Sequence, residues 1–388
     1  MTEPQIIFGK PWFGSEEETL VLRTLQSGWI GQGPLVGEFE RRLAEYVGAP
    51  HVVAVSSCTA ALHLALVAAG VGPEDEVITT PFTFVATLNA IEHTGATAVL
   101  VDPERADLNL TPGAVESAIT ERTRAVVPVH FGGAPLDVDG FAELAERHGI
   151  WIVEDAAHAI GGIAGGRPVG SCAHERSVVC FSFYPNKNLA SAEGGALCTV
   201  DEAFAERVRE LRLHGLEGDA WERYRTDVYR PSLARVPGYK YNWTDLQAAI
   251  ALPQLDRLEG FLASREYLAS EYDRRLRDVE HVSLLERPEL TLARRHALHL
   301  YQVSVDAPPP ARDAILGRLR EQGIGAAVHY IALTRHPYYV ERFSSSSFPV
   351  SEWASDSLLT LPLHVHMHTG DIERVAVSLE SAVDQVLG

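Results

Sequence analysis

The sequence predicts an α/β fold in which a mostly parallel sheet is covered by helices and is followed by a smaller C-terminal α+β domain. The first observation is that apolar, β-branched runs alternate with segments of helical period through the first half of the chain. Such alternation is typical of parallel sheets with helices on both faces. The second observation is a change after Val200 to long, charged helical segments. We therefore expect a large domain over residues 1–250 and a small domain over residues 251–388.

The predicted strands of the large domain are short and rich in valine, isoleucine and threonine. Their ranges are 51–55, 76–80, 97–101, 124–130 and 151–155. Helical patterns at 59–70 and 141–149 each end at a glycine, a common helix stop. Ligands of such sheets bind beyond the carboxyl ends of the strands, so functional residues are expected there.

The C-terminal domain is expected to begin with a long charged helix over 251–278. A strand at 299–305 and a helix at 312–323 would follow, and a last helix would begin near Asp371. The period of the apolar residues supports each of these assignments.

The composition is typical of a globular protein without a membrane or nucleic-acid partner. Hydrophobic residues make up 46% of the 388 residues and charged ones 22%. No apolar run reaches the roughly 18 residues that a membrane helix needs, and no signal-like segment opens the chain, so we expect a cytoplasmic protein. The net charge of −19 argues against nucleic-acid binding, because proteins of that kind present basic faces.

No metal site and no dinucleotide-binding motif are expected. The four cysteines have no CxxC spacing. The glycines between residues 28 and 37 lack both the GxGxxG spacing and the preceding strand of a dinucleotide fingerprint. The alternating His364, His366 and His368 are expected to be structural or solvent-exposed rather than metal ligands.

One lysine stands out because lysine is rare in this chain. Among 33 basic residues only Lys10, Lys187 and Lys240 are lysines. Lys187 lies within FSFYPNKNLASAEGG at 181–195, where a buried strand is followed by tight turns. Arginine stays protonated, whereas a buried lysine can lose its proton and attack a carbonyl. Although a single lysine is usually a solvated surface residue, this setting favours a catalytic one.

Two further segments offer partners for such a lysine. Ser57 and Thr59 in SSCTAAL lie between a strand and a helix, where N–H groups and hydroxyls can bind phosphate, although both are also ordinary helix caps. Asp155 ends the strand in WIVEDAAHA, and His158 follows three residues later. A carboxylate in that position can pair with a protonated pyridine nitrogen, or it can cap a helix.

An aromatic platform would complete the set. Phe82 and Phe84 follow the strand at 76–80, and one of them could lie flat on an aromatic ring, while both could equally belong to the core. A lysine, a carboxylate, a phosphate cradle and an aromatic platform together describe a pyridoxal-phosphate site. We therefore expect this cofactor at the carboxyl end of the sheet.

The chain resembles the nucleotide-sugar aminotransferases of the DegT/StrS group, which are fold-type I pyridoxal-phosphate enzymes. The motifs that carry the resemblance are, in chain order, SGWIGQGPLVGEFE, SSCTAALHLAL, DEVITTPFTFVATLNAI, VPVHFGG, EDAAHAIGG, FSFYPNKN followed by EGG, GYKYNWTDLQAA and LPLH. They extend over nearly the whole chain. The resemblance implies the fold-type I architecture, with a large cofactor-binding domain and a smaller C-terminal one.

The resemblance also implies a role for each site residue. Lys187 corresponds to the lysine that forms the internal Schiff base and moves the proton, Asp155 to the partner of the pyridinium nitrogen, and His158 to the partner of the ring's phenolic oxygen. Phe84 is the more similar of the two aromatics to the family's stacking residue. The implied phosphate ligands are Ser57, Cys58, Thr59 and Ser182. The implied substrate contacts, which could equally be core or interface residues, are Trp29, His329 and Tyr330.

In relatives, the loop that corresponds to GYKYNWTD at 238–245 reaches into the active site of the neighbouring subunit. The resemblance therefore implies a homodimer in which Lys240 and Asn242 complete the partner's phosphate site. Many relatives carry Asn at the first of these positions and Arg at the second, so it stays open which of the two residues contacts phosphate.

An intact Lys187 places the chain with the aminotransferases rather than with the family's dehydratase branch, in which histidine replaces this lysine.

The resemblance implies that L-glutamate gives its nitrogen to the cofactor, leaving pyridoxamine phosphate, and that a keto nucleotide sugar then takes it. GYKYN is similar to the loop of enzymes that aminate C4, which favours a 4-keto-6-deoxyhexose on dTDP or UDP. The product would be a sugar such as dTDP-4-amino-4,6-dideoxyglucose, in a deoxysugar or antibiotic pathway. A 3-keto acceptor and a non-catalytic regulator with the same fold are the alternatives, and a regulator would need neither Lys187 nor Asp155.

Overall fold

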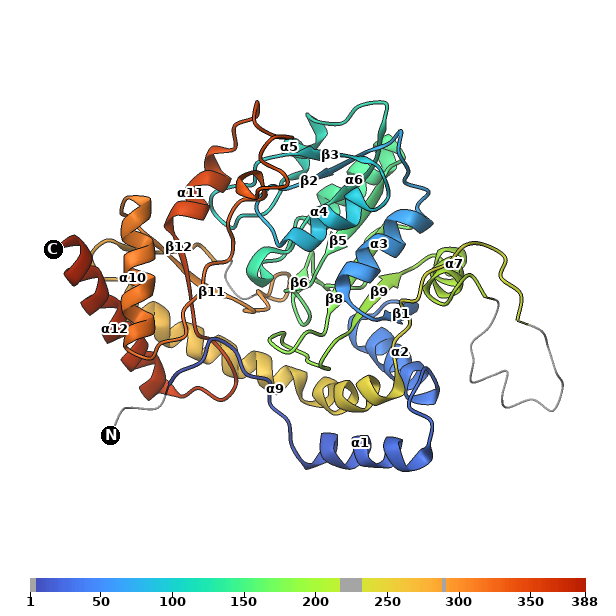
Figure 1. Cartoon of the computed structure of the whole chain (residues 1–388), viewed down its shortest axis with the longest axis horizontal. Coiled ribbons are helices and arrows are strands. Elements are labelled where there is room, and N and C mark those ends of the chain that lie inside the picture. The colour runs from blue at the N-terminus through green and yellow to red at the C-terminus, as the bar shows by residue number, and fades with distance from the viewer. Residues whose placement is uncertain (1–4, 217–231, 288–290) are drawn as a thin grey trace.

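The computed structural model describes residues 5–216, 232–287 and 291–388, and its centre is a seven-stranded sheet (Figure 1). The strand order is β1-β9-β8-β5-β4-β2-β3. The five strands β8, β5, β4, β2 and β3 run parallel to one another, whereas β9 is antiparallel to its neighbours β1 and β8. The strands are β1 (His51–Val55), β2 (Glu76–Thr79), β3 (Thr97–Leu100), β4 (Thr123–Val127), β5 (Trp151–Asp155), β8 (Ser177–Ser182) and β9 (Gly195–Thr199). The expected mostly parallel α/β fold is confirmed.

Helices cover both faces of this sheet. Successive residues of a strand point to opposite sides, and here both sets of side chains are apolar and must be covered. Val52 and Ala54 of β1 belong to a core shared with α2 (Pro34–Val47), α6 (Val138–His148) and α9 (Asp245–Leu276). Val53 and Val55 belong to the opposite core, shared with α3 (Cys58–Ala68), α4 (Val85–Glu92) and α7 (Glu202–Arg212). Burial on both sides explains why these strands are apolar throughout rather than alternating.

The remaining elements of the large sheet region are peripheral. They are α1 (Ser15–Ser27), α5 (Pro112–Glu116), a short 3-10 turn (Phe131–Gly133) and the hairpin strands β6 (Ile163–Ala164) and β7 (Arg167–Pro168). Helix α1 packs along α9, as Figure 1 shows.

A second, antiparallel sheet forms the C-terminal region. Its order is β10 (Val282–Leu284), β11 (Tyr301–Val305) and β12 (Leu358–Leu361). The C-terminal half of α9 packs with this sheet in a separate core. The helices that follow α9 are α10 (Pro309–Glu321), the 3-10 turn Leu333–Arg335, α11 (Pro349–Ser357) and α12 (Thr369–Leu387).

Helix α9 joins the two regions and begins earlier than the sequence predicts. It starts at Asp245, after Thr244, whose hydroxyl accepts a hydrogen bond from Gln247 N at 3.3 Å and caps the helix. The helix therefore extends across the domain boundary predicted at residue 250, and that boundary stays a prediction. In the part of the chain described here, no helix is both long and apolar enough to cross a membrane.

Candidate active site

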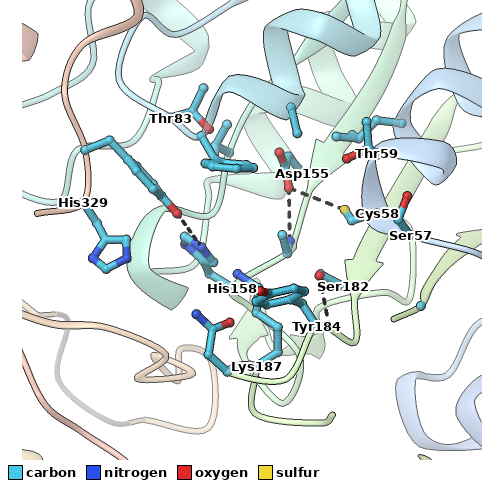
Figure 2. A pocket seen from close by; sticks show the side chains of 18 of the residues that line it. Ser57, Cys58, Thr59, Thr83, Asp155, His158, Ser182, Tyr184, Lys187 and His329 are labelled. Atoms are coloured by element: carbon cyan, nitrogen blue, oxygen red, sulfur yellow. Dashed lines mark hydrogen bonds between the residues drawn. The ribbon is translucent and has the colours of Figure 1, made fainter. Parts of the chain in front are cut away.

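A cavity of about 450 Å³ opens at the carboxyl ends of the parallel strands (Figure 2). This is where ligands of parallel α/β sheets bind. Most of the site residues predicted from the sequence line it, namely Ser57, Cys58, Thr59, Phe84, Asp155, His158, Ser182, Lys187, His329 and Tyr330.

Lys187 lies on the loop that follows β8. The two ends of the loop are joined by the hydrogen bond from Phe183 N to Gly194 O at 2.9 Å, and inside the loop Lys187 N donates to Tyr184 O at 2.9 Å. Burial of the amine lowers the pKa of Lys187 to about 8, although the nearby Cys58 and Asp155 act in the opposite direction. A substantial fraction of this amine is therefore neutral near pH 8, as a nucleophile or base requires.

Asp155 is the last residue of β5, and its carboxylate is held on both oxygens. Oδ2 accepts a hydrogen bond from Thr87 Oγ1 at 2.7 Å, and Oδ1 accepts one from Ala157 N at 3.1 Å. The thiol of Cys58 also lies 3.8 Å from Oδ1 (Figure 2). Burial raises the pKa of Asp155, while these hydrogen bonds and the charge of Lys187 lower it. The carboxylate is thus a buried anion that a cationic ligand group would stabilise.

His158 follows β5 in a tight turn and is a neutral imidazole with a defined tautomer. Burial lowers the pKa of His158 far below its usual value, and the charge of Lys187 adds to this effect. Its Nδ1 accepts a hydrogen bond from Gly132 N at 3.2 Å, so the ring proton belongs on Nε2. Nε2 lies 3.1 Å from the hydroxyl of Tyr330 and can donate to an oxygen there.

The N-terminus of α3 forms an anion-binding edge of the cavity. Ser57 is the N-cap, and its hydroxyl accepts a hydrogen bond from Ala60 N at 3.1 Å. Cys58 and Thr59 are the first two residues of the helix, so their N–H groups have no carbonyl partner within it and are available to an anion. Gly195 of β9 makes room for this edge, because a Cβ there would lie 2.5 Å from Cys58 N.

The structure distinguishes the two phenylalanines that sequence patterns leave equivalent. Phe82 is 0% exposed and packs in a small core with Phe131. Phe84 is the N-cap of α4, is 56% exposed and faces the cavity. Of these two phenylalanines, Phe84 is therefore the one placed to stack on a ligand in the cavity.

Three predicted site residues do not line the cavity of the single chain. Trp29 lies near the start of α2, and its indole N–H donates to Gln32 O at 3.0 Å. Lys240 and Asn242 lie on an extended segment that pairs with Leu213 and Val55. Their side chains alternate with Tyr239 and Tyr241, whose rings pack on His63. The trans role of this segment stays a prediction, as does the role of Trp29.

Two residues next to the site carry no signal in the sequence. Thr87 binds Asp155 from helix α4, and His299, two residues before β11, has its Nε2 3.4 Å from Lys187 Nζ. Helical periodicity could place Thr87 on the same face as Thr83, but no spacing rule relates either residue to Asp155. His299 lies 112 positions from Lys187 in the chain, so only the fold brings the two together.

These residues fit pyridoxal phosphate and define the class of protein as a fold-type I pyridoxal-phosphate enzyme. The fit rests on the amine at the cavity, the buried carboxylate that lacks a cationic partner within hydrogen-bonding distance among the described residues, and the free N–H groups of α3. The chain belongs to the DegT/DnrJ/EryC1/StrS aminotransferase family, whose model matches residues 12–380. It is therefore an aminotransferase that uses pyridoxal phosphate.

Solved structures support this assignment over almost the full length. Spr1654 from Streptococcus pneumoniae, assigned as a sugar aminotransferase and solved with the pyridoxamine form of the cofactor, is 31% identical with a TM-score of 0.90, over 98% of this chain and 100% of that one. The aminotransferase TlmJ from Streptoalloteichus hindustanus is 32% identical with a TM-score of 0.89, over 99% and 100%. DesV from S. venezuelae is 34% identical with a TM-score of 0.86, over 95% of each chain.

Proposed function

We propose that this enzyme transfers the amino group of L-glutamate to a 4-keto-6-deoxyhexose linked to dTDP or UDP, giving the 4-amino-4,6-dideoxy sugar. The observation that carries the chemistry is the amine of Lys187, whose pKa burial lowers to about 8 in the cavity that also holds Asp155. The sugar substrate is supported by relatives such as Spr1654, which is assigned as a sugar aminotransferase.

Each residue of the site has a defined task in this proposal. Lys187 Nζ would hold the cofactor and, once released, would move a proton between the substrate carbon and the cofactor carbon in each half-reaction. Asp155 would hold the ring nitrogen in its protonated form, and Nε2–H of His158 would donate to the ring's phenolic oxygen. Phe84 would cover one face of the ring. Bound pyridoxal phosphate supplies the electron sink that stabilises negative charge at the substrate carbon.

The phosphate group would lie at the N-terminus of α3. The N–H groups of Cys58 and Thr59 and the hydroxyl of Ser182 at the end of β8 would bind it. Lys240 and Asn242 of the second subunit would complete this site, so the active form would be a homodimer. Neither residue is among those that line the cavity of its own chain.

The 4-keto acceptor is supported by the loop GYKYN, which is similar to that of C4-aminating enzymes. His329 and Tyr330 line the cavity and would contact the sugar. The proposed place of the reaction is the cytoplasm, in the biosynthesis of a deoxyamino sugar.

The absorption spectrum of the purified enzyme tests the proposed cofactor chemistry. We expect a visible band of lysine-bound cofactor that bleaches when L-glutamate is added and returns with 2-oxoglutarate. Lys187→Ala should lack the band, and Lys187→Arg is a matched control that keeps the charge but cannot form the bond. A wild-type protein that forms no band with added pyridoxal phosphate would contradict the assignment of the site.

A panel of keto nucleotide sugars then tests the acceptor. The bleached enzyme should regain its band with a 4-keto-6-deoxy sugar on dTDP or UDP, and product NMR should place the new amine at C4. Recovery with a 3-keto sugar alone would overturn the C4 proposal and leave the aminotransferase assignment intact.

A further inference from the structure

The contact between Lys187 and His299 connects the catalytic loop to the C-terminal region of the fold. His299 Nε2 lies 3.4 Å from Lys187 Nζ, and the histidine is 5% exposed. Its other ring nitrogen, Nδ1, is buried and has no partner among the described residues. The ring also packs on His158, with centroids 4.5 Å apart. His299 therefore contacts both the lysine and the histidine of the site without lining the cavity itself.

The backbone around His299 is held from three directions. Nη1 of the buried Arg265, on α9, donates to Leu298 O at 3.1 Å and to Leu363 O at 2.9 Å. Nδ2 of Asn188, next to Lys187, donates to Ala297 O at 2.7 Å. The 3-10 turn adds two bonds, from Ala297 N to Gly133 O at 2.9 Å and from Leu300 N to Gly132 O at 3.1 Å. These contacts leave the imidazole little freedom to move away from the lysine.

The residue before His299 shows what this placement requires of the backbone. Leu298 has a φ of 50°, a left-handed conformation that a leucine adopts only where its surroundings impose it. Strained backbone of this kind tends to occur at functional sites. The left-handed backbone at Leu298 immediately precedes His299 and is an observation separate from the distance between the two side chains.

We propose that His299 is the positioning residue for Lys187: its Nε2 accepts a hydrogen bond from the amine and holds it in place whenever the lysine is not bound to the cofactor. This inference rests on the proposed function, in which Lys187 must be released and must then move a proton between the substrate carbon and the cofactor carbon. A lysine side chain has four rotatable carbon bonds, so a fixed acceptor limits where a released amine can go.

The groups that face the amine are consistent with this direction of donation. Asp155 and Cys58 lie on one side, and three imidazoles, of His158, His299 and His329, are close enough to respond to the lysine's charge. Burial lowers the pKa of His299 far below its usual value, so the ring is neutral. An ammonium group has no lone pair and can only donate, which requires Nε2 to be the acceptor and Nδ1 to carry the ring proton.

The scarcity of lysine makes a direct test possible. In full-length protein labelled with lysine-[15Nζ], only three side-chain signals exist, and Lys10→Arg and Lys240→Arg variants assign them. The signal of Lys187 is followed against pH in the pyridoxamine form of the enzyme and in the chain freed of cofactor. Measurements on the cofactor-free chain do not depend on cofactor chemistry, so they test the contact between His299 and Lys187 even if the proposed function fails.

Two substitutions separate hydrogen bonding from packing. His299→Phe keeps a ring against His158 but removes the acceptor, and the titration midpoint of Lys187 should fall by about one pH unit. His299→Gln keeps an acceptor and should leave the midpoint within about 0.3 units of wild type. The proton-transfer rate with glutamate should fall about tenfold or more in His299→Phe, with a larger isotope effect from α-deuterated glutamate and an unchanged glutamate affinity.

Two outcomes would overturn the proposal. An unchanged midpoint in His299→Phe would show that Nε2 does not bind the amine. Equal shifts in His299→Phe and His299→Gln would show that the imidazole only fills space. Failure of the glutamate reaction in wild-type enzyme, with the NMR differences present, would reject the proposed function while the contact stands.

Discussion

Thr87 Oγ1 donates a 2.7 Å hydrogen bond to Asp155 Oδ2, which connects the third residue of α4 to the last residue of β5. Both residues are buried, and Ala157 N occupies the other carboxylate oxygen. The carboxylate therefore has one orientation toward the cavity. Its alignment with a ligand depends on a helix that is far from β5 in the sequence.

Replacing Thr87 with Val should weaken cofactor binding about tenfold, because the near-isosteric valine removes one hydrogen bond to a charged group. Titration of the cofactor-free protein with pyridoxal phosphate measures the effect. Thr87→Ser keeps the hydroxyl and should bind nearly as well as wild type. Equal loss of affinity in both variants would assign the effect to packing instead.

Asp155→Asn should raise the stability of the cofactor-free protein at neutral pH while it abolishes most activity. Burial raises the pKa of Asp155 in the folded state, so folding favours the protonated carboxyl. That contribution is lost as the pH rises from the unfolded value, near 3.9, through the folded pKa. Urea unfolding should show a higher free energy of unfolding for the variant than for wild type near pH 8, and a smaller difference near pH 4.

Phe82→Leu and Phe84→Leu should have opposite effects although the two residues are neighbours. Phe82 is fully buried, so its loss should reduce the free energy of unfolding by about 1–2 kcal/mol. Phe84 faces the cavity and is 56% exposed, so its loss should leave that free energy almost unchanged and weaken cofactor binding. Urea unfolding and cofactor titration of both variants distinguish the two roles. Similar stability losses would show that Phe84 is a core residue.

The reactivity of Lys187 should rise with a midpoint near pH 8. Burial lowers the pKa of this amine to about 8, and only the neutral form reacts with acylating reagents. Limited acetylation of cofactor-free protein, quantified by mass spectrometry, should therefore increase about tenfold per pH unit below pH 8 and then level off. Lys10 in the same sample is the internal comparison. A continued rise of Lys187 acetylation above pH 9.5 would contradict the predicted midpoint.

Mixed dimers should show whether the segment with Lys240 and Asn242 acts in trans. Neither residue lines the cavity of its own chain. Lys187→Ala and Asn242→Ala homodimers should each be weak or inactive. In an equal mixture half of the dimers contain one chain of each kind, and one of the two sites in such a dimer combines an intact Lys187 with an intact Asn242. The mixture should therefore regain up to about a quarter of wild-type activity. The same experiment with Lys240→Ala identifies which residue contributes more. No recovery in either mixture would argue that the segment serves its own subunit.

Sequence patterns predict the architecture and place Ser57, Asp155 and Lys187 near one site, whereas the resemblance to the family was needed to single out Cys58, Ser182, His329 and Tyr330 among the residues that line the cavity. The strand and helix periods differ, so the alternation of elements is visible in the order of apolar residues. Carboxyl ends of parallel strands share one edge of a sheet, which is why the sequence assigns Asp155 and Lys187 to one site. The sequence predicts the long helix only from residue 251, whereas α9 starts at Asp245, because the polar and small residues there carry no strong period.

Only the tertiary structure decided which residues contact and hold the site residues that the sequence singles out. Phe82 and Phe84 are equivalent in sequence patterns, and only tertiary packing distinguishes them, because Phe82 is buried against Phe131 while Phe84 stays exposed at the N-cap of α4. Thr87 and His299 lie 68 and 112 positions from their partners, Asp155 and Lys187. Local propensity acts over a few residues, whereas contacts over such separations exist only after the chain has folded. The sequence therefore determined the reactive groups of this aminotransferase, and the fold determined how they are held.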